Sequence, residues 1–322
     1  MSVWSLYTED VLKLRHRSLL SMSDLTPKQV LGVLDLAAAL KAVRGGDCPI
    51  NWRGTRALAL IFEKASLRTR VTFELGMREL GGVPIVLGPA EIGLGKRESA
   101  ADVARNLQRW VSAVMARVFD HCVLVEMRNS VQMPIINGLS DIEHPCQTLA
   151  DLLTLRERLG HLNGARVAWV GDGNNVAHSL MIGCALVGAS FVAACPPGYE
   201  PRSEMVRLAR SLAADQDAIE VVSDPIAAVR GSDAVYTEVW ASMGQEHEAA
   251  ERRKAFMAYQ VNSDLMAHAA PHAIFMHCLP AHRGDEVTDE VLDGPQSAAL
   301  DQAENRLHAQ KAVLALLIGS QS

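Results

Sequence analysis

Short runs of apolar residues alternate with amphipathic stretches along almost the whole chain, and this alternation restricts its fold more than any other feature. Residues 56–62, 166–170 and 190–194 have the length and aliphatic content of buried strands. Stretches with apolar side chains at helical spacing separate them, for example residues 25–42 and 177–186. Strands that alternate with helices form parallel sheets covered on both faces, so the chain is predicted to be an α/β protein with doubly wound sheets.

The other predicted elements continue this alternation. Further strands are predicted at residues 85–87, 113–118, 134–136, 234–238 and 273–277, and further helices at 102–111, 147–159, 205–212 and 303–318. Because 322 residues exceed what one hydrophobic core usually supports, we expect two domains. The helix at 147–159 would join them, which gives two doubly wound parallel-sheet domains joined by helices.

Charge, cysteine spacing and the apolar stretches argue against several kinds of binding partner and cellular location. A net charge of −6 argues against nucleic acid or an anionic membrane as the main partner. The six cysteines include no CxxC pair and no zinc-type spacing, so reduced thiols in the cytoplasm are expected. Acidic residues within the first 20 positions argue against a secretory signal. The longest nearly apolar stretch, residues 180–195, is interrupted by glycines and is too short to span a membrane.

A candidate anion site follows the predicted strand at residues 56–62. The sequence Ser66-Leu67-Arg68-Thr69-Arg70 opens a helical pattern, and Ser66 is a favourable N-cap. The exposed N–H groups and the positive end of the helix dipole favour an anion there. Arg68 and Thr69 add a guanidinium and a hydroxyl that suit phosphate oxygens.

This motif resembles the phosphate-binding SxRTR of the aspartate and ornithine carbamoyltransferases. Three further motifs resemble signatures of that family in the same order, and the likeness extends over about residues 19–317. They are Phe62-Glu63-Lys64, His144-Pro145-Cys146-Gln147 and His277-Cys278-Leu279-Pro280. The resemblance implies a carbamoyl phosphate-binding domain at residues 1–146, with the helix at 303–320 packing back on it. It also implies an ornithine-binding domain at 147–302.

The resemblance assigns the carbamoyl phosphate site residue by residue. The implied binding residues are Ser66, Leu67, Arg68, Thr69, Gly93, Arg117, His144, Gln147, Cys278, Leu279 and Arg306. Those implied to take part in catalysis are Arg68, Arg117, His144 and Cys278. The chemistry of the side chains agrees, because His144 can donate to the carbamoyl oxygen and Gln147 can accept from its NH2 group. Cys278 is not expected to be a nucleophile, since the transfer needs no acyl-enzyme.

The acceptor site decides among the transferases of the family. The sequence Ser242-Met243-Gly244 resembles the loop that marks the ornithine enzymes. Together with two further matches to family positions, it gives the implied ornithine-binding residues, which are Asn175, Glu238, Ser242 and Met243. Two positions depart from the pattern. Glu238 stands where ornithine enzymes have Asp, and Gly93 stands where many relatives carry Gln. A carboxylate that reaches one methylene further could accommodate a shifted or different acceptor.

The expected reaction is carbamoyl transfer from carbamoyl phosphate to L-ornithine, without a metal or organic cofactor and in a homotrimer or an assembly of trimers. Two alternatives remain open, namely transfer to putrescine or an N-acylated ornithine, and a carbamoyl phosphate-binding relative without catalysis. A dinucleotide-binding dehydrogenase is disfavoured. In Gly171-Asp172-Gly173-Asn174-Asn175-Val176 the third glycine of the fingerprint is replaced, and no acidic residue ends the next strand.

Overall fold

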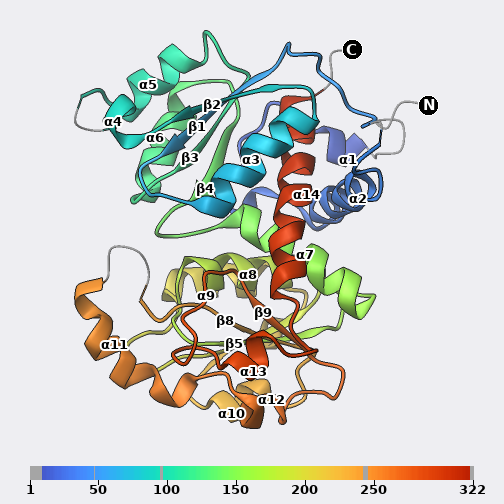
Figure 1. The fold of residues 1–322 in the computed structure, drawn as a ribbon, viewed down its shortest axis with the longest axis vertical. Helices are drawn as coiled ribbons and strands as arrows, with labels where there is room; N and C mark the ends of the chain where they lie inside the picture. Colours follow the sequence, from blue (N-terminus) through green and yellow to red (C-terminus); the bar gives the residue numbers. More distant parts are fainter. Residues whose placement is uncertain (1–8, 47, 95–96, 242–245, 320–322) are drawn as a thin grey trace. The chain divides into compact units, whose positions relative to one another are not determined.

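The computed structural model describes residues 9–46, 48–94, 97–241 and 246–319. The chain divides into two compact units (Figure 1). Unit 1 comprises residues Met1–Leu153 and Glu304–Ser322, and unit 2 comprises Thr154–Ala303. Helix α7 (Pro145–Leu159) begins in unit 1 and ends in unit 2, and helix α14 (Ala299–Ile318) begins in unit 2 and ends in unit 1.

Unit 1 contains a four-stranded sheet in which every pairing is parallel, with the order β2-β1-β3-β4. Its strands are β1 (Ala57–Phe62), β2 (Val83–Leu87), β3 (Ala113–Arg117) and β4 (Ile135–Leu139). Its other helices are α1 (Glu9–Leu12), α2 (Pro27–Ala42), α3 (Leu67–Glu79), α4 (Pro89–Ile92), α5 (Ala100–Leu107) and α6 (His121–Ser130), with a 3-10 turn η2 (Met22–Asp24).

Unit 2 contains a five-stranded parallel sheet with the order β7-β6-β5-β8-β9. Its strands are β5 (Arg166–Val170), β6 (Ser190–Ala194), β7 (Ile219–Val222), β8 (Ala234–Thr237) and β9 (Ile274–His277). Its helices are α8 (Asn175–Val187), α9 (Ser203–Leu212), α10 (Pro225–Val229), α11 (Ala249–Phe256), α12 (Ser263–Met266) and α13 (Asp289–Leu292), with 3-10 turns η3 (Gln216–Ala218), η4 (Glu246–Glu248) and η5 (Met257–Tyr259).

Helices cover both faces of each sheet, which confirms the predicted doubly wound α/β class. In unit 1 one core forms between the sheet and helices α5 and α6, where Ile61 and Val114 meet Val103 and Leu124. In unit 2 the corresponding core lies between the sheet and helices α10 and α12. Helix α8 is mostly apolar, in keeping with the burial of every residue that follows Asn175 in it. No helix of the described residues is long and apolar enough to cross a membrane.

Several elements differ from the prediction, and helices α6 and α11 are among those that were not predicted. Strand β2 starts at Val83 and contains Pro84, which is tolerated because β2 is an edge strand. Helix α5 ends at Leu107 instead of residue 111. Strand β7 was not predicted, since it is a four-residue edge strand whose exposed Glu220 breaks the apolar run.

Candidate active site

The predicted phosphate residues of unit 1 meet at the carboxyl edge of its sheet. Strands β1, β3 and β4 end together, because Phe62 pairs with Arg117 and Arg117 pairs with Leu139. The strand order reverses direction between β1 and β3, and ligands of doubly wound folds bind beyond the strand ends at such a point. A register shift between β3 and β4 lies beside Arg117. Gly138 permits it, since a Cβ there would lie 2.2 Å from Met115 Sδ.

Helix α3 presents its N-terminus at this edge. The Ser66 hydroxyl caps the helix by accepting a hydrogen bond from the Thr69 backbone N–H at 3.2 Å. The helix has 13 residues, so its dipole and remaining first-turn N–H groups favour a bound anion. The Leu67 side chain, 75% exposed, points to solvent, so only its backbone N–H is suited to a phosphate oxygen.

Four side chains from separate parts of unit 1 form a buried network behind this helix end. The Arg306 guanidinium donates to Thr69 Oγ1 at 2.8 Å and to Gln147 Oε1 at 2.7 Å. Arg117 Nη1 approaches the same Thr69 hydroxyl at 3.5 Å, and Gln147 Nε2 donates to Asp151 at 2.7 Å. The network places two guanidinium groups behind the start of α3, where they would stabilise an anionic ligand.

His144 is held in its neutral form beside these arginines. Burial lowers the pKa of His144 well below its usual value, and the charges of Arg306, Arg117 and Arg68 lower it further. A hydrogen-bond network fixes the preceding segment: Asn137 Nδ2 donates to the carbonyl oxygen of Glu143 at 3.2 Å. A neutral imidazole can donate one hydrogen bond without adding charge, which suits a contact with a carbonyl oxygen.

Gly93 is placed on a separate turn of unit 1. It ends the one-turn helix α4 with φ 54°, a left-handed conformation that favours glycine. Its N–H donates to Pro89 and its carbonyl accepts from Arg97. The structure thus accounts for glycine at this position by its backbone conformation. The neighbouring residues Gly95 and Lys96 lie outside the described residues.

In unit 2 the predicted acceptor residues Asn175 and Glu238 follow strands β5 and β8, and Cys278 and Leu279, which were predicted to bind carbamoyl phosphate, follow β9. These strands are neighbours in the sheet, and the strand order reverses direction between β5 and β8. Asn175 is the first residue of α8, Glu238 directly follows β8, and Cys278 directly follows β9. Ser242 and Met243, also predicted to bind the acceptor, lie outside the described residues.

Asn174 is a site residue that the sequence analysis missed. Its Oδ1 caps helix α8 by accepting from the N–H groups of Val176 and Ala177, while its Nδ2 donates to Glu238 Oε2. The signal available in the sequence was an Asn before an apolar helical stretch, which is a strong N-cap. That signal explains the cap but not the contact with a residue 64 positions away.

The carboxyl group of Glu238 has a raised pKa. Burial raises its pKa to about 7, against the stabilising effect of the hydrogen bonds from Asn174 and Cys278. The nearby charge of Asp172 raises the pKa further, and Glu286 adds a smaller effect. A carboxyl group that titrates near neutrality is a functional-site signal. The group carries its negative charge mainly above pH 7, where it would suit a cationic ligand.

The loop after β9 is held by a buried His–Glu pair. His277 Nδ1 accepts from the Leu279 N–H at 2.8 Å, so its Nε2 carries the proton and donates to Glu286 at 3.2 Å. Leu279 has φ 58° and precedes a cis peptide bond to Pro280. Cys278 is buried between these two anchored residues and hydrogen-bonds Glu238.

A second buried ion pair supports the loop between β5 and α8. Arg252 contacts Asp172 at 3.2 Å and donates to the Trp240 carbonyl oxygen at 3.0 Å. It also pairs with Glu248 at 2.9 Å. Burial raises the pKa of Asp172 to about 6, while Arg252 opposes that effect. Arg252 therefore contacts both Trp240 and Glu248, which lie on either side of positions 242–245 in the sequence.

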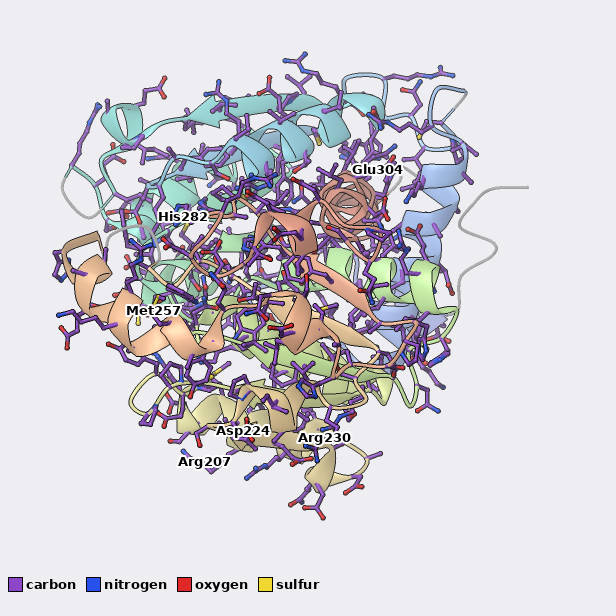
Figure 2. The ribbon with its side chains drawn as sticks, turned by 60° about the horizontal axis from the view of Figure 1, so that its bottom comes forward. Arg207, Asp224, Arg230, Met257, His282 and Glu304 are labelled. Atoms are coloured by element: carbon purple, nitrogen blue, oxygen red, sulfur yellow. The ribbon has the colours of Figure 1, made fainter. Side chains whose placement is uncertain are left out.

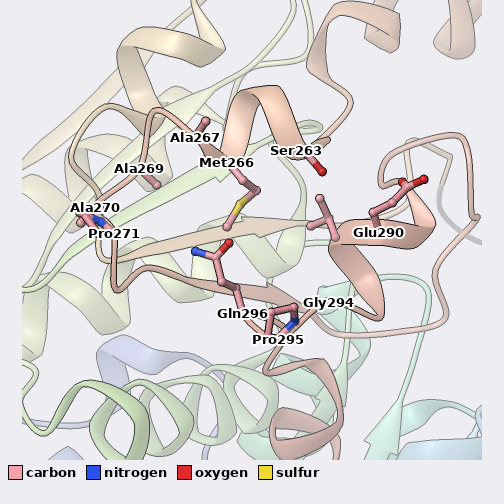
Figure 3. A pocket seen from close by; sticks show the side chains of 11 residues that line it. Ser263, Met266, Ala267, Ala269, Ala270, Pro271, Glu290, Gly294, Pro295 and Gln296 are labelled. Atoms are coloured by element: carbon pink, nitrogen blue, oxygen red, sulfur yellow. The ribbon is translucent and has the colours of Figure 1, made fainter.

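Unit 2 has a surface cavity that is separate from the predicted site residues. It has a volume of about 520 Å³, and its lining residues come from helices α12 and α13 and from the segments around β9 (Figure 3). The lining includes Ser263, Met266, Glu290 and Gln296 and none of the predicted site residues. Among the described residues, no group of three His, Cys, Asp or Glu side chains is arranged to hold a metal ion.

Two family models match the chain almost end to end. The model described as "Aspartate/ornithine carbamoyltransferase, carbamoyl-P binding domain" matches residues 17–157. The model described as "Aspartate/ornithine carbamoyltransferase, Asp/Orn binding domain" matches residues 163–317. The first match contains the SLRTR, Arg117, His144 and Gln147 positions, and the second contains the Asn174, Glu238 and Cys278 positions.

Individual relatives are similar over nearly their whole length. The ornithine carbamoyltransferase of Pyrococcus abyssi is 50% identical over 310 residues, which cover 96% of this chain and 98% of the relative. The anabolic ornithine carbamoyltransferase of Pyrococcus furiosus is also 50% identical over 310 residues, with the same coverage. A solved structure of ornithine carbamoyltransferase from Pyrococcus furiosus has a TM-score of 0.92 at 49% identity and covers 96% of this chain and 99% of its own.

Proposed function

Because this chain belongs to the aspartate/ornithine carbamoyltransferase family, we propose that it transfers the carbamoyl group of carbamoyl phosphate to the side-chain amine of L-ornithine. The products are L-citrulline and phosphate. The observation that carries the donor half is the buried network of Arg117, Thr69, Arg306 and Gln147 at the start of α3. The preference for ornithine is supported by relatives of about 50% identity that bear that name.

We assign carbamoyl phosphate to unit 1. Its phosphate would accept from the first-turn N–H groups of α3 and from Arg68, Thr69 and Arg117. His144 would donate to the carbamoyl oxygen, and the Gln147 carbonyl oxygen would accept from the carbamoyl NH2 group. Arg306 would hold Thr69 and Gln147 in place while adding positive charge. The same donors stabilise the oxyanion that develops when the carbamoyl carbon is attacked.

We assign the amino acid to unit 2, where Glu238 and Asn175 would bind the charged groups of ornithine. The neutral side-chain amine attacks the carbamoyl carbon, and the bond from that carbon to the oxygen that bridges it to phosphorus breaks. Phosphate leaves with the electron pair and takes the proton that the amine loses. A free alkylamine has a pKa of about 10.4, so turnover should increase as pH rises above neutrality.

We further propose that the chain works in the cytoplasm as a homotrimer or an assembly of trimers, and that it acts in arginine biosynthesis. An exposed apolar stripe on α3, formed by Leu67, Val71 and Leu75, supports self-association. Cysteines without disulfides support a reducing compartment. The relative named anabolic supports the biosynthetic direction.

The test is ureido-product formation from carbamoyl phosphate with four acceptors in parallel, namely ornithine, putrescine, N-acetylornithine and aspartate. We expect citrulline from ornithine at a kcat/KM at least about 100-fold above that of any other acceptor. Product from putrescine or N-acetylornithine alone would keep the carbamoyltransferase and reassign its acceptor. No product from any acceptor, together with stabilisation by carbamoyl phosphate, would contradict the catalytic proposal.

A further inference from the structure

Asn174 connects the first turn of α8 to the carboxylate after β8, although the family resemblance pointed only to its neighbour Asn175. The orientation of its amide is determined by the helix. Oδ1 accepts from the N–H groups of Val176 at 3.0 Å and Ala177 at 3.2 Å, which only the oxygen can do. The NH2 group must therefore face the Glu238 carboxylate.

The backbone around Asn174 leaves the amide little freedom to move. A Cβ at Gly173 would lie 2.1 Å from Pro201 N, so the loop before α8 packs directly against the neighbouring backbone. The Gly173 N–H donates to the Tyr199 carbonyl oxygen at 2.8 Å. Helix α8 itself is buried in the unit 2 core. Asn174 thus links Glu238 to a rigid part of the unit.

The other groups that face Glu238 do not supply the same contact. Asp172, in the loop after β5, and Glu286, in the loop after β9, are acidic and repel its charge. The Cys278 thiol is a weak donor. Arg252 is paired with Asp172. A neutral amide donor orients the carboxylate without cancelling its charge, so the charge stays available to a cationic substrate.

We propose that Asn174 is a positioning residue for the acceptor, because its amide holds the Glu238 carboxylate in the orientation that receives an ammonium group of the substrate. This inference rests on the proposed ornithine carbamoyltransferase activity. Its consequence is that the donor group of Asn174, rather than its helix cap, determines acceptor affinity.

The substitution Asn174→Asp separates these two roles. Asp caps helices as well as Asn does, so Oδ1 can still accept from Val176 and Ala177. The NH2 group that donates to Glu238 is replaced by a carboxylate oxygen. When two carboxyl groups are adjacent, the negative charge of one raises the pKa of the other. Asn262→Asp is the matched control, because Asn262 caps α12 in the same unit by accepting from the Leu265 N–H at 2.9 Å.

The measurements are KM for ornithine, KM for carbamoyl phosphate and the pH profile of kcat/KM for ornithine. For Asn174→Asp we expect the ornithine KM to rise at least about 10-fold and the acidic limb of the profile to move to higher pH. The carbamoyl phosphate KM should change by less than about 2-fold. Asn262→Asp should leave all three unchanged.

An unchanged ornithine KM and profile in a folded Asn174→Asp variant would overturn the inference. Thermal unfolding with and without inorganic phosphate shows whether the variant is folded and binds anions. If it does not fold, Asn174→Ser decides in its place, since it keeps a capping hydroxyl without an added charge, and the same rise in ornithine KM is expected. Failure of the proposed function is distinct, since the unsubstituted protein would then form no citrulline.

Discussion

Arg306 acts on residues that are remote in sequence, because its two hydrogen bonds reach Thr69 and Gln147, 237 and 159 positions away. A guanidinium has a fixed fork of donors, so one side chain can hold a hydroxyl and an amide at a set separation. At the scale of single residues, the proposed donor site therefore depends on an arginine that lies on helix α14.

The substitution Arg306→Ala should weaken carbamoyl phosphate binding. Both hydrogen bonds and one positive charge are lost from a buried position, so we expect the carbamoyl phosphate KM to rise at least about 100-fold. Arg158→Ala is the matched control, because Arg158 makes an exposed ion pair with Asp301 at 2.7 Å. Steady-state kinetics with both substrates measures the effect. A KM within about 3-fold of the unsubstituted value would contradict the assigned role.

The substitution Glu238→Gln should separate stability from activity. The pKa of Glu238 is raised to about 7 from an ordinary 4.5, so the folded chain binds more protons than the unfolded chain between these pH values. The free energy of unfolding therefore falls as pH rises through this window, and the penalty is complete above pH 7. Glu238→Gln removes the penalty, so its Tm at pH 8 should equal or exceed that of the unsubstituted protein.

The activity of Glu238→Gln should fall despite that stability. The neutral amide cannot attract an ammonium group, so we expect kcat/KM for ornithine to fall about 100-fold at pH 8. Glu220→Gln, on the exposed face of β7, is the control and should change neither quantity. A lower Tm at pH 8, or unchanged kinetics, would show that Glu238 has a different role.

At the scale of elements, both candidate sites are built at helix N-termini that follow a parallel strand. Ser66 caps α3 after β1, and Asn174 caps α8 after β5. The turn before α8 requires a close approach of two backbones, since a Cβ at Gly173 would lie 2.1 Å from Pro201 N and 2.4 Å from Glu200 C. These neighbours are backbone atoms, so a side chain at position 173 would displace the turn.

The substitution Gly173→Ala should therefore reduce both stability and acceptor binding. We expect a loss of about 1–3 kcal/mol in the free energy of unfolding, because the loop must shift to admit a methyl group. Gly46→Ala is the control, since the nearest atom to a Cβ there is Val43 O at 3.5 Å. Urea denaturation measures both variants. A change below about 0.5 kcal/mol for Gly173→Ala would contradict the close packing of this turn.

At the scale of the whole molecule, a network of ion pairs fastens the last helix within unit 1. Lys311 pairs with Glu79 on α3 at 2.6 Å. Glu304, which is labelled in Figure 2, lies 3.6 Å from Lys41 on α2. Gly76 allows α3 to approach α14, because a Cβ there would lie 3.0 Å from Lys311 Cγ. The opposite side of α3 exposes Leu67, Val71 and Leu75 to solvent.

The double substitution Val71→Glu and Leu75→Glu should dissociate the proposed trimer. Charges in an apolar interface are costly to desolvate, so we expect a sedimentation coefficient typical of a monomer of 34.9 kDa. Leu31→Glu on α2 is the control, since Leu31 is similarly exposed at 42%. If the double variant sediments like the unsubstituted protein, the α3 stripe is not the contact surface.

The sequence alone determined the fold class, and it indicated most of the residues that are proposed for the donor site. Local periodicity predicts strands and helices because each element has its own hydrophobic pattern. The SLRTR motif predicted a capped helix start after a strand, which the structure contains, and such a helix start favours an anion. Short edge elements such as β7 were missed, since a four-residue strand carries little periodic signal.

Only the tertiary structure decided which remote side chains meet. The contact of Arg306 with Thr69 and Gln147 depends on the return of α14 to unit 1, and the contact of Asn174 with Glu238 depends on β5 and β8 being neighbours. The raised pKa of Glu238 has the same origin, because burial and the approach of Asp172 exist only in the folded chain. Spacing along a sequence encodes local geometry, whereas sheet order and helix packing bring distant residues within hydrogen-bond range.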